Sequence, residues 1–139
     1  MTIRGVRGAI SIPEDTPDQI YAATRELLEA VRAANPGLDP ADLASVFFTL
    51  TPDLCSAFPA LGARQLGWVS VPLLCAQEIP VPGSLPRILR VLLHWNTELP
   101  QEAMHHVYLK DAVRLRPDLA QNNPVIRQEQ DTGLAFSAR

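Results

Sequence analysis

Apolar and polar side chains alternate along residues 2–12, which predicts a β-strand at the start of the chain. Val6 and Ile10 fall on one face of this strand, and Arg7 falls on the other, between two small residues. Small neighbours leave space around a long side chain. We therefore expect Arg7 to point away from the apolar face, toward room for a ligand.

The next apolar residues recur at helical spacing and predict the longest helix of the chain. The segment Thr16-Pro17-Asp18-Gln19 supplies a capping Thr, a Pro at the first helical position and a Gln three residues after the cap. Asn35-Pro36-Gly37 ends the helix. The apolar stripe between these signals is interpreted as core rather than as part of a site; it comprises Ile20, Thr24, Leu27, Leu28 and Val31.

Shorter apolar segments bounded by Pro or Gly predict the remaining elements. These are a helical turn at 39–42, strands at 45–50, 69–76, 87–95 and 104–108, and a short helix from Phe58 to Gly67. Pro72 favours an edge position or a bulge for the strand at 69–76. We therefore expect an α+β fold with a mixed five-stranded sheet, one long helix and one short helix, in a single domain over residues 1–139 whose end, about 120–139, is a flexible tail.

Composition narrows the possible functions. Apolar residues make up 47% of the chain and charged residues 19%, which is typical of a globular protein. The net charge of −3 argues against a nucleic-acid partner, so an anionic ligand would need a local basic cluster. No apolar run approaches a membrane span and no signal peptide is recognisable, so we expect a cytoplasmic protein without a membrane partner.

One charge stands out against the pattern, because Arg90 lies in the middle of the apolar segment 88–93. Burying an unpaired charge is expensive, so Arg90 needs a partner or a ligand. A ligand-binding role, a structural salt bridge and an exposed edge all remain open on this pattern. Glu78, which follows another apolar strand, is a possible partner or a solvated loop carboxylate. Tyr108 ends a strand and is either a packing residue or a ligand contact.

Other chemistry is not indicated by the sequence. Cys55 and Cys75 have no paired spacing, which predicts neither a disulfide framework nor a zinc site. His105 and His106 belong to no cluster with metal-ligand spacing and are interpreted as surface histidines, and His94 as a packed or edge histidine. No nucleotide or phosphate-loop signature occurs. Arginines in or beside apolar strands suit a reaction that needs only charge stabilisation and positioning.

A series of short segments resembles, in the expected order over residues 3–119, the monofunctional chorismate mutases of the trimeric α+β type. The segments are Ile3-Arg4-Gly5-Val6-Arg7-Gly8-Ala9, Thr51-Pro52-Asp53-Leu54, Phe58-Pro59-Ala60, Gly67-Trp68, Val71-Pro72, Cys75-Ala76-Gln77-Glu78, Ile88-Leu89-Arg90-Val91, His106-Val107-Tyr108-Leu109 and Leu115-Arg116-Pro117-Asp118-Leu119. The resemblance implies an isomerase that converts the dianion chorismate to prephenate by an intramolecular Claisen rearrangement. It also implies a homotrimer with a barrel-like core, sites at the subunit interfaces, and neither cofactor nor metal.

The resemblance assigns catalytic roles to Arg90, Glu78 and Arg7 and a substrate-binding role to Tyr108. Arg90 would bind a carboxylate of the side-chain part of the substrate and donate to its ether oxygen. Glu78 would accept from the ring hydroxyl and orient Arg90. Arg7 and Tyr108 would hold the same carboxylate as Arg90.

The remaining residues implied by the resemblance surround the substrate. The pocket would be lined by Cys75, Leu73 and Leu74 and closed by a lid formed from Leu115 and Arg116. The neighbouring subunit would contribute Phe58, Ala60 and Arg64.

Two other functions remain open on the sequence. A non-catalytic module that binds an aromatic-pathway metabolite at a subunit interface would keep the arginines but would not need Glu78. A small trimeric deaminase acting on imines would need an activated water and a carboxylate that moves protons.

Overall fold

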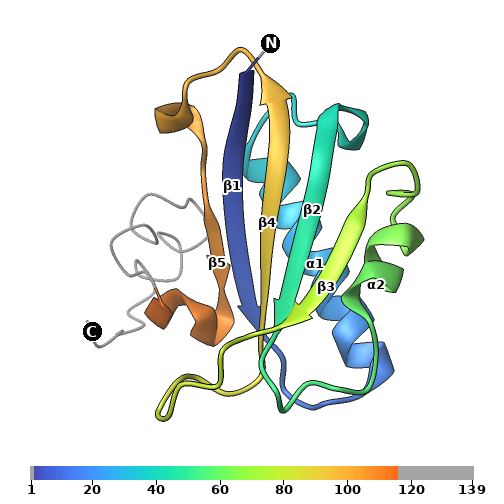
Figure 1. The fold of residues 1–139 in the computed structure, drawn as a ribbon, viewed down its shortest axis with the longest axis vertical. Helices are drawn as coiled ribbons and strands as arrows, with labels where there is room; N and C mark the ends of the chain where they lie inside the picture. Colours follow the sequence, from blue (N-terminus) through green and yellow to red (C-terminus); the bar gives the residue numbers. More distant parts are fainter. Residues whose placement is uncertain (1, 116–139) are drawn as a thin grey trace.

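The computed structural model describes residues 2–115, which form one mixed sheet of five strands with both α-helices on one of its faces (Figure 1). The strands lie in the order β3-β2-β4-β1-β5. β4 pairs antiparallel with β1 and β2, whereas β5 on β1 and β3 on β2 are parallel. The strands are β1 (Thr2–Ser11), β2 (Leu43–Leu50), β3 (Leu73–Gln77), β4 (Ile88–Thr97) and β5 (Val107–Leu109). The α+β class and the mixed five-stranded sheet are thus confirmed, while the predicted tail at 120–139 lies outside the described residues.

The long helix α1 (Pro17–Ala34) begins and ends where its local signals predict. The Thr16 hydroxyl accepts a hydrogen bond from the Gln19 N–H at 3.2 Å, and Asn35 is the C-terminal cap. The short helix α2 (Pro59–Gln65) follows Phe58 as predicted. Three 3-10 helices complete the described part: η1 (Pro40–Asp42), η2 (Gln101–Ala103) and η3 (Lys110–Leu115). No helix within residues 2–115 has the length and apolar character needed to cross a membrane.

The main core lies between α1 and the sheet. Alternate residues of each strand face α1 and are buried, including Val6 of β1, Phe48 of β2 and Leu93 of β4. The intervening residues face the opposite side, which no helix of the described chain covers along most of its length (Figure 1). This second side is called the open face below.

Two strands begin three or four residues later than the sequence predicts. Pro72 has no N–H to donate, and pairing with β2 starts only where its carbonyl accepts from the Val46 N–H at 2.9 Å, so β3 begins at Leu73 rather than 69. β3 is an edge strand, as Pro72 suggests. β5 begins at Val107 rather than 104, because the Asn35 side chain occupies both backbone groups of His105, at 2.9 Å each.

The helices α1 and α2 approach each other closely at Gly62. A Cβ added there would lie 2.9 Å from the Thr24 Cβ and 3.1 Å from the Tyr21 carbonyl oxygen. Neither atom is the flexible end of a side chain, so neither can move aside easily. The close approach fixes the position of α2 and of Phe58, which precedes it.

We therefore expect Gly62→Ala to destabilise the protein. Overpacking costs about 1–3 kcal/mol and exceeds the gain of up to about 1 kcal/mol from better helix propensity. Urea unfolding should show a lower midpoint for Gly62→Ala, with Glu29→Ala on the exposed side of α1 as the control that changes little. An unchanged midpoint in Gly62→Ala would contradict the close helix contact.

Candidate active site

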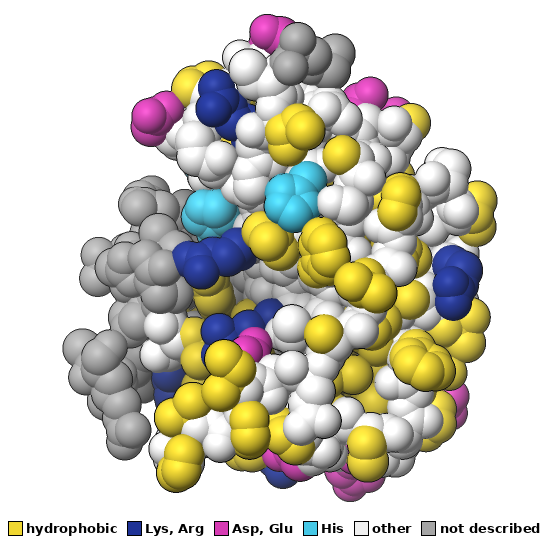
Figure 2. Space-filling model, viewed as in Figure 1, with side chains coloured by type: hydrophobic (Ala, Val, Ile, Leu, Met, Phe, Trp, Pro, Cys, Tyr) yellow, Lys and Arg dark blue, Asp and Glu magenta, His cyan; other side chains and the backbone are white. Residues whose placement is uncertain are grey.

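Basic and apolar side chains gather on the open face of the sheet (Figure 2). Arg90 lies on β4 between two neighbours of the same sheet, Ala9 of β1 and Thr49 of β2. Ala9 is also paired with Tyr108 of β5, so its small side chain separates Arg90 from Tyr108. Arg7 lies two residues before Ala9 on the same face. The pairing thus brings together side chains from four strands, β1, β2, β4 and β5.

These residues line a cavity of about 220 Å³. Its wall includes Arg7, Glu78 and Arg90, which the resemblance makes catalytic, and Tyr108, which the resemblance makes substrate-binding. The other lining residues are small or apolar apart from Thr49; they are Gly8, Ala9, Phe47, Val91 and Leu92. Two guanidinium groups in a cavity of this size suit a small anion that carries carboxylates.

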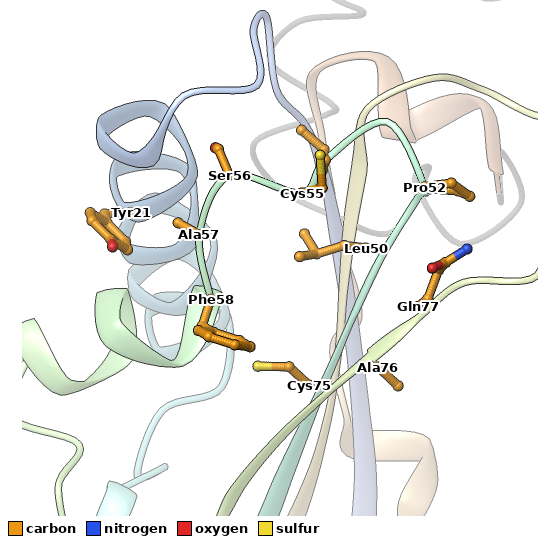
Figure 3. Close-up of a pocket in the computed structure, with 11 residues that line it drawn as sticks. Tyr21, Leu50, Pro52, Cys55, Ser56, Ala57, Phe58, Cys75, Ala76 and Gln77 are labelled. Carbon is orange, nitrogen blue, oxygen red and sulfur yellow. The ribbon is translucent and has the colours of Figure 1, made fainter.

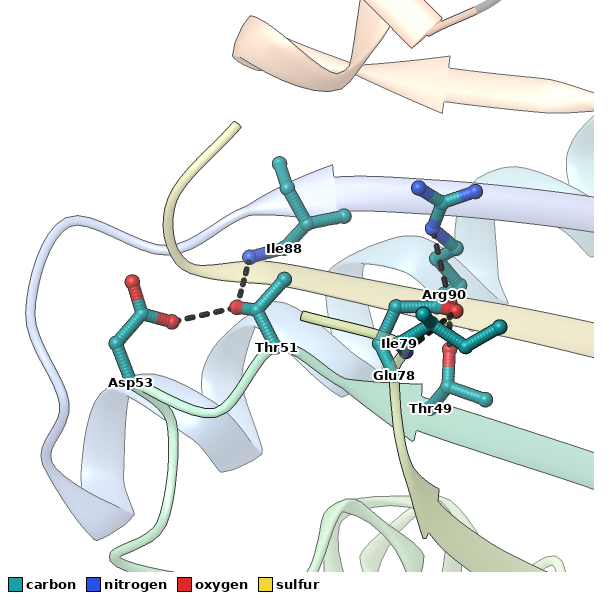
Figure 4. A network of polar contacts seen from close by, with 7 residues as sticks. All are labelled: Thr49, Thr51, Asp53, Glu78, Ile79, Ile88 and Arg90. Carbon is teal, nitrogen blue, oxygen red and sulfur yellow. Dashed lines mark hydrogen bonds and ion pairs between the residues drawn. The ribbon is translucent and has the colours of Figure 1, made fainter. Parts of the chain in front are cut away.

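Glu78 is the acidic partner of Arg90 across the sheet (Figure 4). Its Oε2 lies 3.3 Å from Arg90 Nε and accepts a hydrogen bond from the Thr49 hydroxyl at 3.0 Å. Its Oε1 accepts from the Ile79 N–H at 3.1 Å. The carboxylate is therefore held by a hydroxyl of β2 and an N–H of its own loop, and it lies in ion-pair contact with Arg90 of β4.

Arg90 Nε is in close contact with Glu78 but is not satisfied by it. The N–H does not point at the carboxylate closely enough for a hydrogen bond, and Nε is buried without another acceptor among residues 2–115. The side chain as a whole remains 43% exposed, so the end of the guanidinium is accessible from the cavity. A buried donor without an acceptor is unfavourable in a folded protein, and its presence points to a ligand or a function.

Neighbouring groups fix the backbone on the β1 side of the cavity. The Arg7 N–H donates to His106 Nδ1 at 2.9 Å, which ties β1 to the segment that leads into β5. Tyr108 is buried, and it packs with Ala9 and with Leu115 of η3. Leu115 therefore borders the same region as the cavity, whereas Arg116 lies outside the described residues.

A second, larger cavity of about 460 Å³ lies at the side of the sheet that faces the helices (Figure 3). Cys75 and Phe58 line it together with Cys55 and Tyr21, and none of its lining residues is charged. It therefore lacks the cations that an anionic ligand requires. Cys75, expected to line the substrate pocket, directs its side chain to the core side of β3 and lines this cavity instead of the arginine cavity.

The other predicted residues of the pocket wall are dispersed within the single chain. Leu73 packs against the core, while Leu74 is 59% exposed on the open face. Ala60 is buried on α2, and Arg64 is exposed on the same helix and lines neither cavity. Phe58 is 73% exposed and lies at the rim of the larger cavity.

Thr49 and Phe47 line the arginine cavity and are not among the residues singled out from the sequence. Both lie on β2, in a segment that reads as an ordinary apolar strand. Only the register of β2 against β4 places them beside Arg90 and Leu92. His106 was likewise interpreted as an ordinary surface residue, and its contact with Arg7 depends on the pairing of β1 with β5.

The comparison with protein families gives a match to chorismate mutase type I over residues 3–119. The chain belongs to this family. A chorismate mutase AroH of Thermus thermophilus is 60% identical over 117 residues, which cover 84% of this chain and 96% of that protein. The chorismate mutase AroH of Bacillus subtilis strain 168 is 42% identical over 121 residues, which cover 86% of this chain and 94% of that protein. Among solved structures, a chorismate mutase from Clostridium thermocellum matches with a TM-score of 0.75 at 44% identity, over 78% of this chain and 96% of that one.

Within residues 2–115, His, Cys, Asp and Glu form no group of three or more that could hold a metal ion.

The thiol of Cys55, which lines the larger cavity, is less acidic than an ordinary cysteine thiol. Asp15 Oδ2 accepts from the Cys55 thiol at 3.4 Å, and this hydrogen bond together with the charge of Asp15 raises the pKa of Cys55. A hydrogen bond from the Ser56 side chain, opposed by some desolvation and aided by backbone N–H groups, lowers the pKa of Asp15.

We predict that Asp15→Asn makes Cys55 react faster with iodoacetamide at neutral pH. The amide keeps an oxygen for the backbone N–H groups but removes the charge that opposes the thiolate, so the pKa of Cys55 falls toward its usual value. The rate can be followed by mass spectrometry, with Cys55→Ser reporting the background from Cys75. Equal alkylation rates in the wild type and in Asp15→Asn would show that Asp15 does not control this thiol.

Proposed function

We propose that this protein is a chorismate mutase, which rearranges chorismate to prephenate. Membership of the chorismate mutase type I family supports the proposal. The observation that carries it is the buried Arg90 Nε, which has no hydrogen-bond acceptor in the described chain and lies beside Glu78 in a cavity that also holds Arg7 and Tyr108. The reaction breaks one carbon–oxygen bond and forms one carbon–carbon bond within one molecule. It needs no proton transfer, no covalent enzyme intermediate and no cofactor.

The charges of the cavity suit the substrate. The whole chain carries a net charge of −3, so a dianion is attracted only where cations are concentrated. Arg7 and Arg90 provide this concentration on neighbouring strands. In the proposed complex, Arg7 and Tyr108 bind a carboxylate of the side-chain part, and the Arg90 guanidinium binds the same carboxylate.

Arg90 also donates to the ether oxygen, on which negative charge grows as the bond to the ring lengthens. A donor that is already in place stabilises this charge in the transition state more than in the ground state. Removing one such donor typically lowers kcat by about 10²–10³-fold, whereas enzymes accelerate their reactions by at least about 10⁶-fold. The compact reactive shape imposed on the substrate must supply much of the difference. Glu78 contributes to it by accepting from the ring hydroxyl.

The proposed active form is a homotrimer with a barrel-like core, in the cytoplasm, with each site completed by a neighbouring chain. The open face of the sheet supports an interface, because it exposes apolar side chains such as Phe47 at 38% and Leu74 at 59%. Phe58 and Leu61 are similarly exposed at α2. In the trimer, the neighbouring subunit contributes Phe58, Ala60 and Arg64 to the site. Leu73, Leu74 and Cys75 then lie along the wall, and Leu115 and Arg116 close over the ligand.

We expect Arg90→Lys to lower kcat by at least about 10²-fold while the protein remains folded. The charge survives, but a compact ammonium cannot reach a carboxylate and an ether oxygen with one rigid fork. The measurement is the loss of chorismate absorbance in the ultraviolet, with prephenate identified as the product. Arg32→Lys, on the exposed side of α1, is the matched control and should remain fully active.

The same assay tests the function itself. Wild-type protein that leaves chorismate unchanged would refute the mutase proposal and favour a binding module. Near-normal turnover in Arg90→Lys would instead leave the mutase in place and remove the role given to Arg90.

A mixing experiment tests the shared site. Arg90→Ala and Arg64→Ala trimers should each be poor enzymes, and when they are unfolded together in equal amounts and refolded, roughly a quarter of the sites should regain both arginines in a head-to-tail cyclic trimer. Activity should then rise toward that fraction of the wild-type value. Each parent refolded alone is the control, and native mass spectrometry verifies that mixed trimers form. Mixed trimers with no more activity than the mean of the parents would exclude a site completed by Arg64 of the neighbouring chain.

A further inference from the structure

The position of Glu78 is set by groups other than Arg90 (Figure 4). Its backbone N–H donates to the Leu50 carbonyl at 2.8 Å, which continues the parallel pairing of β3 with β2 by one residue beyond Gln77. From this point the side chain lies over β2, where the Thr49 hydroxyl donates to Oε2 at 3.0 Å. The Ile79 N–H donates to Oε1 at 3.1 Å. Each carboxylate oxygen thus has its own neutral donor.

Thr49 is placed by the sheet to do this. It is paired with Arg90 of β4 on one side and with Ala76 of β3 on the other, and all three side chains emerge on the open face. Ala76 is too small to fill the space between β3 and Thr49, so the Glu78 carboxylate can reach the hydroxyl. The branched Cβ of Thr49 restricts its rotamers, which makes the hydroxyl a well-defined anchor.

Without such an anchor, Arg90 and Glu78 would form a different pair. A guanidinium and a carboxylate in contact favour two parallel N–H···O hydrogen bonds. In this structure the two side chains approach each other at 3.3 Å through Arg90 Nε, and that N–H lacks the direction of a hydrogen bond. The carboxylate is therefore held close enough to Arg90 to orient it, but not in the geometry that would engage the donors of its guanidinium.

We infer that Thr49 is a positioning residue for the reaction: its hydroxyl holds Glu78 so that Arg90 keeps its donors for the substrate. The inference rests on the proposed function, since it concerns how the site binds and stabilises a reacting dianion. Thr49 acts through Glu78 and does not itself touch the reacting atoms. Loss of the hydroxyl lets the carboxylate turn onto Arg90 and compete with the substrate carboxylate and ether oxygen.

Thr49→Val tests this with almost no change in volume. A hydrogen bond to a charged group is worth enough that its loss should lower kcat/KM by roughly ten-fold or more. Thr49→Ser restores the hydroxyl and should recover most of the activity. Thr97→Val, at the far end of β4, removes a strand hydroxyl away from the cavity and should behave as the wild type.

A double-mutant cycle separates positioning from a general loss of structure. In a Glu78→Ala background there is no carboxylate to hold, so adding Thr49→Val should change kcat/KM by less than about two-fold. If Thr49→Val is as active as the wild type, the inference is wrong. If its effect is equally large with and without Glu78, Thr49 acts by another route and the inference is also wrong.

A crystal structure of Thr49→Val gives a result that does not depend on activity. We expect the Glu78 carboxylate to have moved into a two-hydrogen-bond pair with Arg90, whereas in Thr49→Ser it stays where it is. A carboxylate that keeps its position in Thr49→Val overturns the inference. Wild-type protein without mutase activity would refute the proposed function instead, and the two crystal structures would still decide what holds Glu78.

Discussion

The site depends on one unfavourable arrangement, a guanidinium placed in the central strand of the sheet. β4 is paired along its length by β1 and β2, so Arg90 cannot move away from the sheet without breaking backbone pairing on both sides. Its charge must therefore be accommodated where it stands. Glu78 does this in part, through a contact at 3.3 Å, and the accessible end of the side chain remains available to a ligand. The positions of Thr49, Ala9 and Tyr108 all follow from their pairing around this residue.

The strands divide stability and chemistry between the two faces of the sheet. Leu89, Val91 and Leu93 alternate with Arg90 and Leu92 along β4, so a single strand contributes to the core on one side and to the cavity on the other. The buried centre of the helix face can then be built mainly from apolar side chains. The open face carries the arginines, with small residues of β1 between them that leave room for a ligand. A change on one face is thus largely separated from the other by the thickness of the sheet.

Local signals in the sequence were sufficient for the elements, but not for the relations between them. The ends of α1 are encoded by neighbouring residues, Thr16 and Asn35, and the prediction was correct at both. The start of β5 was misplaced because the interaction that displaces it comes from Asn35, 70 residues earlier. The site residues likewise differ in whether neighbouring residues or distant pairing reveals them. Arg90 is conspicuous because its charge conflicts with its own strand, whereas Thr49 is ordinary within β2 and becomes informative only when β2 is paired with β4 in the observed register.

The same reasoning explains why the costly group lies on β4 and not on an edge strand. A buried donor without an acceptor costs about 1–3 kcal/mol, a large part of the roughly 5–15 kcal/mol by which a typical domain is stable. On the edge strands β3 or β5, each paired along one side only, local opening would relieve that cost and disperse the site. On β4, opening would require the loss of backbone pairing with both neighbours and of the buried leucines on the reverse side. The unfavourable donor is therefore kept in place, and an acceptor supplied by the substrate gains an interaction that the folded chain does not provide for itself.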